Sequence, residues 1–208
     1  MIIRNVIYAI LLGVSMAACL SQQDEENTTQ AEAATPELQG SDIDTDAIDL
    51  RSAPAAYAIA KGHVGNIKIG MPIEQLRNNV PAGLHITDTT LTQEGQQSTA
   101  YLLTPQGQHK GLLVEQDCQQ ECSIWRISVR SPTYKTASGM GVGSKYSEIQ
   151  QAYKISSVSF EEGNVVAIAP EAGMSFIIDH SQLSQQQLAR VNAKNLPANT
   201  LVKRVLVY

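Results

Sequence analysis

A glycine followed by a short amphipathic helix pattern occurs twice in this chain, and this repetition constrains the fold more than any other sequence feature. Apolar residues at a spacing of three and then four positions lie on one face of a helix. The two stripes are Ile73, Leu76 and Val80 after Gly70, and Tyr146, Ile149 and Tyr153 after Gly143. We expect Ser144 to be the N-cap of the second helix. Two such units predict an internal repeat, with copies at about 60–130 and 131–208.

Short apolar runs between turn residues predict strands in both halves. In the segment 124–130, IWRISVR, polar residues interleave the apolar ones, which is typical of a strand with one buried face. Lys203-Arg204-Val205 repeats the pattern of Trp125-Arg126-Ile127, so each half is expected to end in a strand with an outward arginine. The other strands are expected at 84–92, 98–104, 110–116, 155–160, 165–169, 174–179 and 201–208.

The expected fold class is α+β, because each unit combines one short helix with antiparallel strands. Such a unit buries little apolar surface alone, and pairing two copies creates a shared core. We expect the helices to pack on one face of the sheet and the other face to be solvated or available to a partner. A glutamine-rich amphipathic helix is expected at 182–194, before Pro197.

The first 18 residues have the features of a secretory signal peptide: Arg4, an apolar stretch and small residues at the end. Met16-Ala17-Ala18-Cys19 resembles the lipobox of bacterial lipoproteins, which implies cleavage before Cys19 and lipidation of its sulfur and its new amino group. The alternative is an ordinary signal peptide with an incidental cysteine. The residue after Cys19 is Leu20 and not aspartate. By resemblance to the sorting of enterobacterial lipoproteins, the absence of aspartate at this position favours the outer membrane over the inner membrane.

Residues 19–52 form an expected disordered, acidic tether. Nine of the 20 acidic residues lie in this segment, and aromatic residues are absent from it. Such a composition buries too little apolar surface to offset chain entropy. The formal net charge of −5 therefore reflects the tether. Residues 53–208 are long enough for one domain with its own core.

Three cysteines are an odd number for an exported chain, and lipidation of Cys19 leaves a pair. Cys118 and Cys122 flank a three-residue loop between two expected strands, a spacing that allows a disulfide. The alternatives are a reactive or metal-binding role, for which no further ligand stands at ligand spacing.

The remaining polar residues predict no catalytic, metal or cofactor site. His63, His85, His109 and His180 lack a second ligand three or four residues away, and are expected at the surface. Asp179-His180-Ser181 holds triad residue types, but neighbours in a chain point apart, and Asp179 or Ser181 is expected to cap a helix. The glycines before Ser144 predict a tight turn; a phosphate loop is the alternative. Scattered basic residues do not support nucleic-acid binding.

The strand IWRISV, the loop GMGVGS and the helix SEIQQAY, within about residues 60–208, are similar to a family of sigma-E-regulated enterobacterial lipoproteins of unknown function. The helix start IGMPIEQL and the tandem arrangement also resemble beta-lactamase inhibitor protein and the outer-membrane assembly lipoprotein BamE. These resemblances imply a fold and an outer-membrane address on the periplasmic side. They imply no catalytic residues.

Two function classes remain. The first is a non-enzymatic, lipid-anchored envelope protein that binds another envelope protein in envelope maintenance or stress response. The second is a periplasmic carrier or sensor of an apolar or cell-wall-derived ligand held between the two repeats, which needs a cavity of several hundred cubic ångströms. A filled interface between the halves favours the first class, and an empty apolar cavity the second.

The lipobox predicts that radiolabelled palmitate is incorporated at Cys19. Cys19→Ser should lose the label, whereas the control Cys118→Ser should keep it, because only Cys19 follows the cleavage site. Label that persists in Cys19→Ser would contradict lipidation at this residue.

Overall fold

The computed structural model describes residues 55–93 and 95–208, and in these residues most regular structure is β-sheet with few helices. The expected α+β class therefore fits broadly. The signal peptide at 1–18, Cys19 and the tether at 19–52 lie outside the described residues.

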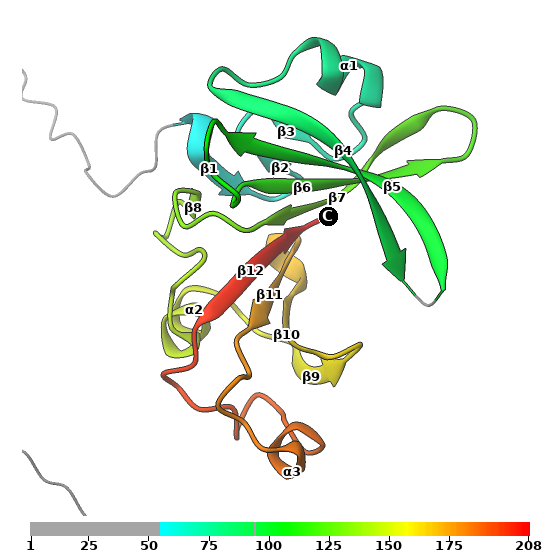
Figure 1. The fold of residues 1–208 in the computed structure, drawn as a ribbon. Helices are drawn as coiled ribbons and strands as arrows, with labels where there is room; N and C mark the ends of the chain where they lie inside the picture. The colour runs from blue at the N-terminus through cyan, green and yellow to red at the C-terminus, as the bar shows by residue number, and fades with distance from the viewer. Residues whose placement is uncertain (1–54, 94) are drawn as a thin grey trace, which may run out of the picture. The chain divides into compact units, whose positions relative to one another are not determined.

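An eight-stranded antiparallel sheet dominates the fold (Figure 1). Its order joins two four-stranded meanders edge to edge, because β7 pairs with β12. Across that junction Val129 pairs with Val205 and Ile127 with Val207. In spatial order the strands are β4 (Leu84–Gln93), β5 (Gln96–Pro105), β6 (Leu112–Cys118), β7 (Cys122–Val129), β12 (Val202–Val207), β11 (Met174–Ile178), β10 (Asn164–Ala169) and β9 (Ser157–Glu161). The eight strands expected from the sequence are confirmed, with bounds shifted by a few residues.

A second, small sheet was not predicted. It has the order β3-β2-β1-β8, and β1 pairs in parallel with β8. Its strands are β1 (Ala58–Ala60), β2 (His63–Val64), β3 (Ile67–Lys68) and β8 (Lys135–Thr136). Strands of two or three residues are too short to show alternation, so no periodicity marks them in the sequence. Ile59, Val64 and Ile67 nevertheless lie in the core.

The helices are short, and three expectations about them were wrong. The helices are α1 (Ile73–Asn78), α2 (Tyr146–Ala152) and α3 (Gln185–Leu188), with short 3₁₀ turns η1 (Ala55–Tyr57) and η2 (Pro170–Ala172). The glutamine-rich helix expected at 182–194 is reduced to the single turn of α3. After this turn, the side chains of Asn192 and Asn195 hydrogen-bond to nearby backbone groups and so compete with the helical hydrogen bonds. Neither Asp179 nor Ser181 caps it; Ser184 is the N-cap.

Ser144 is not the N-cap of α2. The cap position belongs to Lys145, whose backbone N–H donates to the Glu148 side chain at 2.7 Å. The Ser144 hydroxyl instead accepts the N–H of Gly141 at 3.1 Å and is buried, so Ser144 closes the turn that leads into the helix. A capping serine and a turn serine look alike in sequence, because both bond to a backbone N–H three residues away.

The two glycine turns make the same backbone contacts. Each glycine has a positive φ, 81° at Gly70 and 87° at Gly143, which favours glycine. Each glycine donates its N–H to the carbonyl oxygen of a strand residue. The N–H of that strand residue in turn donates to the carbonyl oxygen of the residue after the glycine. The bonds are Gly70 to Ile124 (2.7 Å) with return to Met71 (2.9 Å), and Gly143 to Val202 (2.8 Å) with return to Ser144 (2.8 Å). Each turn is thereby hydrogen-bonded to the last strand of its half, β7 in the first and β12 in the second.

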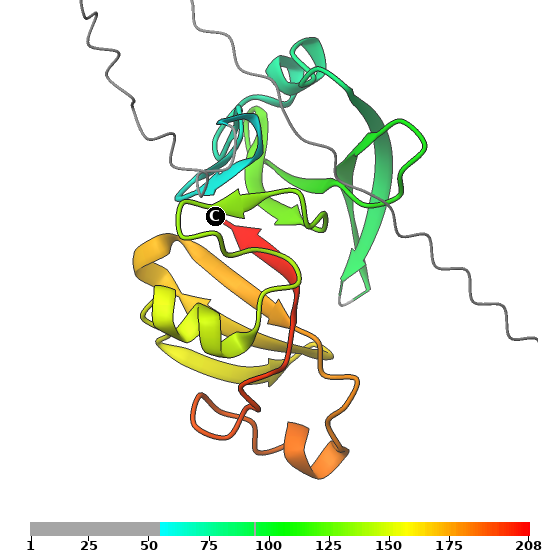
Figure 2. The ribbon, with the colours of Figure 1, turned by 90° about the vertical axis from the view of Figure 1, so that its left-hand side faces the viewer.

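One hydrophobic cluster runs through both halves. Figure 2 shows the short helix α2 beside the strands of the second half. The helix stripes contribute Ile73 and Leu76 from α1, and Tyr146 and Ile149 from α2, all buried. The strand residues that meet them include Ile127, Val205 and Phe176, which are fully inaccessible. The junction between the two meanders is therefore filled by packed side chains on the core side of the sheet.

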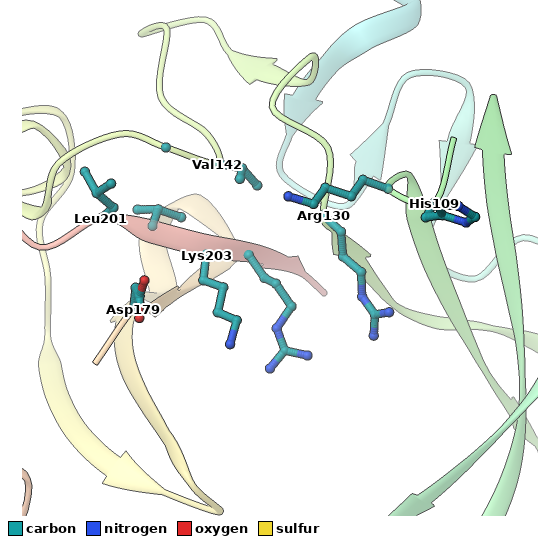
Figure 3. Close-up of a pocket in the computed structure, with 10 residues that line it drawn as sticks. His109, Arg130, Val142, Asp179, Leu201 and Lys203 are labelled. Carbon is teal, nitrogen blue, oxygen red and sulfur yellow. The ribbon is translucent and has the colours of Figure 1, made fainter. Parts of the chain in front are cut away.

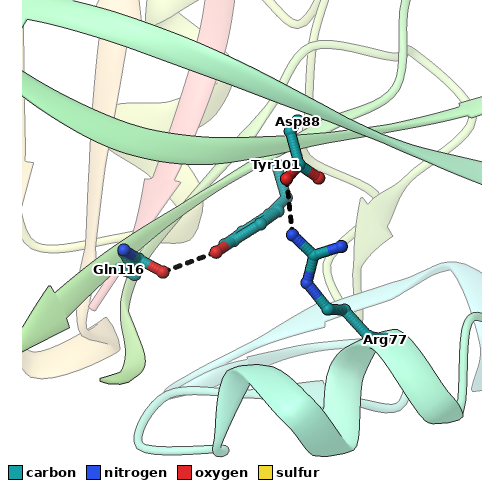
Figure 4. A network of polar contacts seen from close by, with 4 residues as sticks. All are labelled: Arg77, Asp88, Tyr101 and Gln116. Carbon is teal, nitrogen blue, oxygen red and sulfur yellow. Dashed lines mark hydrogen bonds and ion pairs between the residues drawn. The ribbon is translucent and has the colours of Figure 1, made fainter. Parts of the chain in front are cut away.

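Polar contacts connect α1 to β4 and β5 (Figure 4). Arg77 forms an ion pair with Asp88 and lies over the Tyr101 ring, 4.9 Å from its centroid. The Tyr101 hydroxyl donates to the Gln116 side chain at 2.6 Å. The hydrogen bond to Asp88 raises the pKa of Arg77. Because the Arg77–Asp88 pair is exposed, its contribution to stability is small, and α1 depends chiefly on its buried stripe.

The hairpin between β6 and β7 ends in a disulfide between Cys118 and Cys122, as the sequence predicts. The two residues are paired across the hairpin, with their Cα atoms 4.1 Å apart. So small a ring removes little chain entropy, and it stabilises the hairpin by at most about 2 kcal/mol.

Truncation of either helix stripe should destabilise the whole domain. Leu76→Ala and Ile149→Ala should each lower the free energy of unfolding by about 2–5 kcal/mol, because each leaves a cavity in the core. The controls Gln75→Ala and Gln151→Ala alter exposed neighbours and should change it by about 0.5 kcal/mol or less. Urea denaturation measures the difference. Losses below about 1 kcal/mol at both stripe positions would show that the helices do not share the core.

Candidate functional site

The face of the large sheet opposite to the core carries charged side chains on its central strands. Arg126 on β7 and Arg204 on β12 both lie on this open face, as the repeated pattern predicts. Arg130 follows β7, and the β7–β12 register places it one step beyond the Val129–Val205 pair, beside Arg204. The central strands thus bring three arginines together on one surface.

A β-bulge precedes each outward arginine. The pairing of β6 with β7 shifts between Glu115 and Gln116, which leaves Trp125 as the extra residue before Arg126. The pairing of β11 with β12 shifts between Ile177 and Ile178, which leaves Lys203 as the extra residue before Arg204. A bulge interrupts the alternation of side chains and re-aims them. The core residues of each strand therefore stay on the buried face, and the side chain of the extra residue, Trp125 or Lys203, lies near the arginine that follows it.

Arg126 is neutralised by its surroundings. Its guanidinium donates two hydrogen bonds to the Glu115 carboxylate, at 2.8 and 2.6 Å. Its Cζ atom also lies 4.3 Å from the centroid of the Trp125 ring. Glu115 is only 5% exposed, so its charge depends on this bidentate pairing.

Arg130 and Arg204 lack such a carboxylate. Arg204 donates from Nη2 to the Asn164 side chain at 3.0 Å. The buried Nε atoms of both arginines have no hydrogen-bond partner among the described residues. Burial lowers the pKa of Arg204, and the positive charges of Arg130 and Arg126 lower it further. The centre of the open face is thus crowded with positive charge and has unused donors.

Two depressions meet at these arginines. A groove of about 300 Å³ follows the open face. Its lining also includes Glu161 and Glu162 of the β9–β10 hairpin and Leu91 of β4. The groove is therefore lined by side chains of both charges.

The second depression is a pocket of about 590 Å³ beside the junction of the two meanders (Figure 3). Arg130 and Arg204 line it as well as the groove. The other lining residues are His109, Lys110, Val142, Gly143, Asp179, Leu201, Val202 and Lys203. Among the described lining residues, Asp179 supplies the negative charge, and its carboxylate accepts the N–H of Ser181 at 3.0 Å. That hydrogen bond lowers the pKa of Asp179.

Gly111 positions the cationic residues around this pocket. A Cβ atom at Gly111 would lie 1.9 Å from the Leu103 carbonyl oxygen, so no other residue fits without a shift of the backbone. The Gly111 carbonyl accepts the N–H of Arg130 at 2.9 Å. Lys110 and Arg130 are thereby brought to the same end of the sheet.

The structure separates the residues that the sequence singled out. Gly143 lines the pocket, whereas Gly70 lies with the small sheet in another depression, and the Cys118–Cys122 hairpin lies apart from the pocket residues. Of the four histidines, His109 alone lines the pocket. Sequence reasoning assigned Lys110, Arg130 and Lys203 to expected strands and did not predict that they line one pocket. Lys110 and Arg130 lie just outside β6 and β7, and the place of Lys203 depends on a bulge.

Within residues 55–93 and 95–208, no group of three or more histidine, cysteine, aspartate or glutamate residues has a metal-binding arrangement. Among the described helices, none combines the length and apolar character that a membrane crossing requires.

The fold is similar to that of a solved structure, the uncharacterized protein yfeY from Escherichia coli. The TM-score is 0.57 at 16% sequence identity, and the match covers 72% of this chain and 98% of that chain. No protein-family model and no curated protein sequence matches the chain. At this identity the likeness concerns the fold alone. The expected relation to sigma-E-regulated lipoproteins and to BamE stays a prediction.

Substitutions of Arg126 and Arg204 on the open face should differ in their effect on the free energy of unfolding. Arg126→Met leaves the buried Glu115 carboxylate unpaired and should lower the free energy of unfolding by about 3 kcal/mol. Arg204→Met keeps an apolar stem and removes a charge repelled by its neighbours, so the change should be about 1 kcal/mol or less in either direction. Urea denaturation measures both, with Lys68→Met as an exposed control. A loss at Arg204 equal to that at Arg126 would mean that Arg204 is a structural residue.

Proposed function

We propose that this chain is a non-catalytic lipoprotein, anchored to the outer membrane on its periplasmic side, that binds another envelope protein through the open face of its large sheet. The observation that carries this proposal is the groove, which is lined by Arg130 and Arg204 together with Glu161 and Glu162. Charges of both signs in fixed positions favour a partner of complementary charge. Such a role fits envelope maintenance or stress response.

The proposal includes an internal repeat. We infer that residues of about 60–130 and 131–208 are two copies of one unit, with both helices on the same face of the sheet. The mirrored strand order supports this inference, as do the matching backbone bonds of Gly70 and Gly143. The two equivalent bulges, at Trp125 and Lys203, support it further. A repeat of this kind covers one face with helices and leaves the other face for binding.

The packing between the two halves favours a protein partner over an apolar ligand. A carrier of an apolar molecule needs a cavity lined by apolar side chains. Here the helix side of the junction is occupied by Ile127, Val129 and Val205, all inaccessible to solvent. The depressions on the open side are lined by charged residues, which suits a polar partner or a charged cell-wall-derived ligand.

Site-specific photocrosslinking in native cells tests the proposal. A benzophenone amino acid at Leu206 or Val166, both in the groove, should give one discrete crosslinked envelope protein. The matched controls at Glu74 and Gln151, exposed on α1 and α2, should not, because the helices lie on the other face. Adding Glu161→Lys should abolish the crosslink from Leu206, since it reverses one charge in the groove lining.

Two outcomes would contradict the proposal. One is the absence of a discrete crosslink from either groove position. The other is an equal crosslink from the helix positions, which would place the binding surface elsewhere. Persistence of the crosslink after Glu161→Lys would show that the groove charges do not select the partner.

A further inference from the structure

We propose that the pocket beside the β7–β12 junction binds a phosphate group through four cationic side chains: Lys110, Arg130, Lys203 and Arg204. This inference deepens the proposed function by naming a ligand chemistry. It rests on that function only in taking the open face as the binding surface, because Arg130 and Arg204 line both the groove and the pocket.

The four cations converge from three separate segments of the chain. Lys110 precedes β6, Arg130 follows β7, and Lys203 and Arg204 belong to β12. Figure 3 shows Arg130 and Lys203 extending from adjacent strands in the same direction. The bulge at Lys203 is what allows two consecutive residues of β12 to line one pocket. Scattered surface lysines do not have this arrangement.

Unused donors provide the second, independent observation. The Nε atoms of Arg130 and Arg204 are buried and have no hydrogen-bond partner among the described residues. Buried polar groups in folded proteins are normally hydrogen-bonded, so such exceptions require an explanation. The Nε–H and one Nη–H of a guanidinium form a fork that fits two oxygens of a phosphate. A bound phosphate would supply the missing acceptors once the two side chains turn their Nε atoms towards the pocket.

The balance of charge favours a phosphate over a carboxylate. The positive charges of Lys110, Arg130, Lys203 and Arg204 face the single described carboxylate of Asp179, which already accepts the Ser181 N–H. A phosphomonoester carries nearly two negative charges at neutral pH and three strong acceptor oxygens, whereas a carboxylate carries one charge. The dianion relieves more of the repulsion among neighbouring arginines.

The size of the pocket indicates that the phosphate is attached to a larger group. A volume of about 590 Å³ exceeds what a phosphate ion needs. The apolar side chains of Val142 and Leu201 line the pocket beside the cations and would contact that group. A phosphorylated sugar and the headgroup of an anionic lipid share this chemistry.

Isothermal titration calorimetry of the full chain in non-ionic detergent and chloride buffer tests the site, with inorganic phosphate as the probe. Saturable binding with one phosphate per chain is expected. Arg130→Gln and Arg204→Gln should each weaken it by about 10-fold or more, because each removes a charge-assisted bidentate contact. Lys68→Gln removes the same charge from the small sheet and should leave the affinity unchanged.

A second variant keeps the test valid if an arginine variant does not fold. Lys110 and Lys203 are both exposed, so the double variant Lys110→Gln/Lys203→Gln should fold normally, as thermal denaturation will show, and should weaken phosphate binding. Absence of saturable binding by the wild-type chain would overturn the proposal. Equal weakening by Lys68→Gln would also overturn it, because the affinity would then reflect net charge alone.

Two further probes distinguish the sources of the phosphate. Glucosamine 1-phosphate is compared with glucosamine, and phosphatidic acid in detergent micelles with phosphatidylcholine. Tighter binding of the sugar phosphate than of inorganic phosphate supports the site and assigns a soluble saccharide ligand. Tighter binding of phosphatidic acid, lost in Arg130→Gln, supports the site and assigns a lipid.

The crosslinking and calorimetry experiments distinguish failure of the protein-binding proposal from failure of the phosphate-site proposal. A crosslink from Leu206 that persists in a chain without phosphate binding would overturn the phosphate site and leave the protein-binding function intact. Phosphate binding by a chain that gives no crosslink would overturn the protein partner and support the site.

Discussion

The pairing of β7 with β12 is the interaction on which the rest of the structure depends. Each four-stranded meander leaves one edge of unpaired backbone groups beside its last strand, and an exposed edge of this kind invites association. Joining the two edges satisfies both and makes one sheet of eight strands. It also places the buried residues Val129 and Val205 side by side on adjacent strands, so one core is shared by both halves. The same register places Arg130 beside Arg204 on the other side of the sheet.

The two faces of this sheet have different roles because the strands alternate. On the covered face the helix stripes and strand residues exclude water, and truncation there affects the whole domain. On the open face, bulges at Trp125 and Lys203 interrupt the alternation where charge is concentrated. Bulges add twist and re-aim side chains without removing the strands from the sheet. The open face can therefore carry a functional surface at little cost to the core.

The three central arginines differ in how their charge is compensated. Arg126 has a buried carboxylate and an aromatic ring as partners, so it belongs to the framework of the sheet. Arg130 and Arg204 face like charge and keep unused donors. Functional sites commonly hold such unfavourable arrangements, because the ligand supplies what the protein leaves open. The contrast between compensated and uncompensated arginines is the basis on which we propose a binding site at the junction.

The sequence by itself determined the strands, the two glycine turns, the helix stripes and the cysteine pair, because each depends on residues close together in the chain. The spacing of Ile73, Leu76, Tyr146 and Ile149 was sufficient to predict their burial. Ser144 and the helix expected at 182–194 were misassigned, since local hydrogen bonds by serine and asparagine compete with helix formation. Only the tertiary structure decided the small sheet, the β7–β12 junction and the cationic pocket. Lys110, Arg130 and Lys203 come together through a strand register and a bulge, and neither leaves a periodic trace in the sequence.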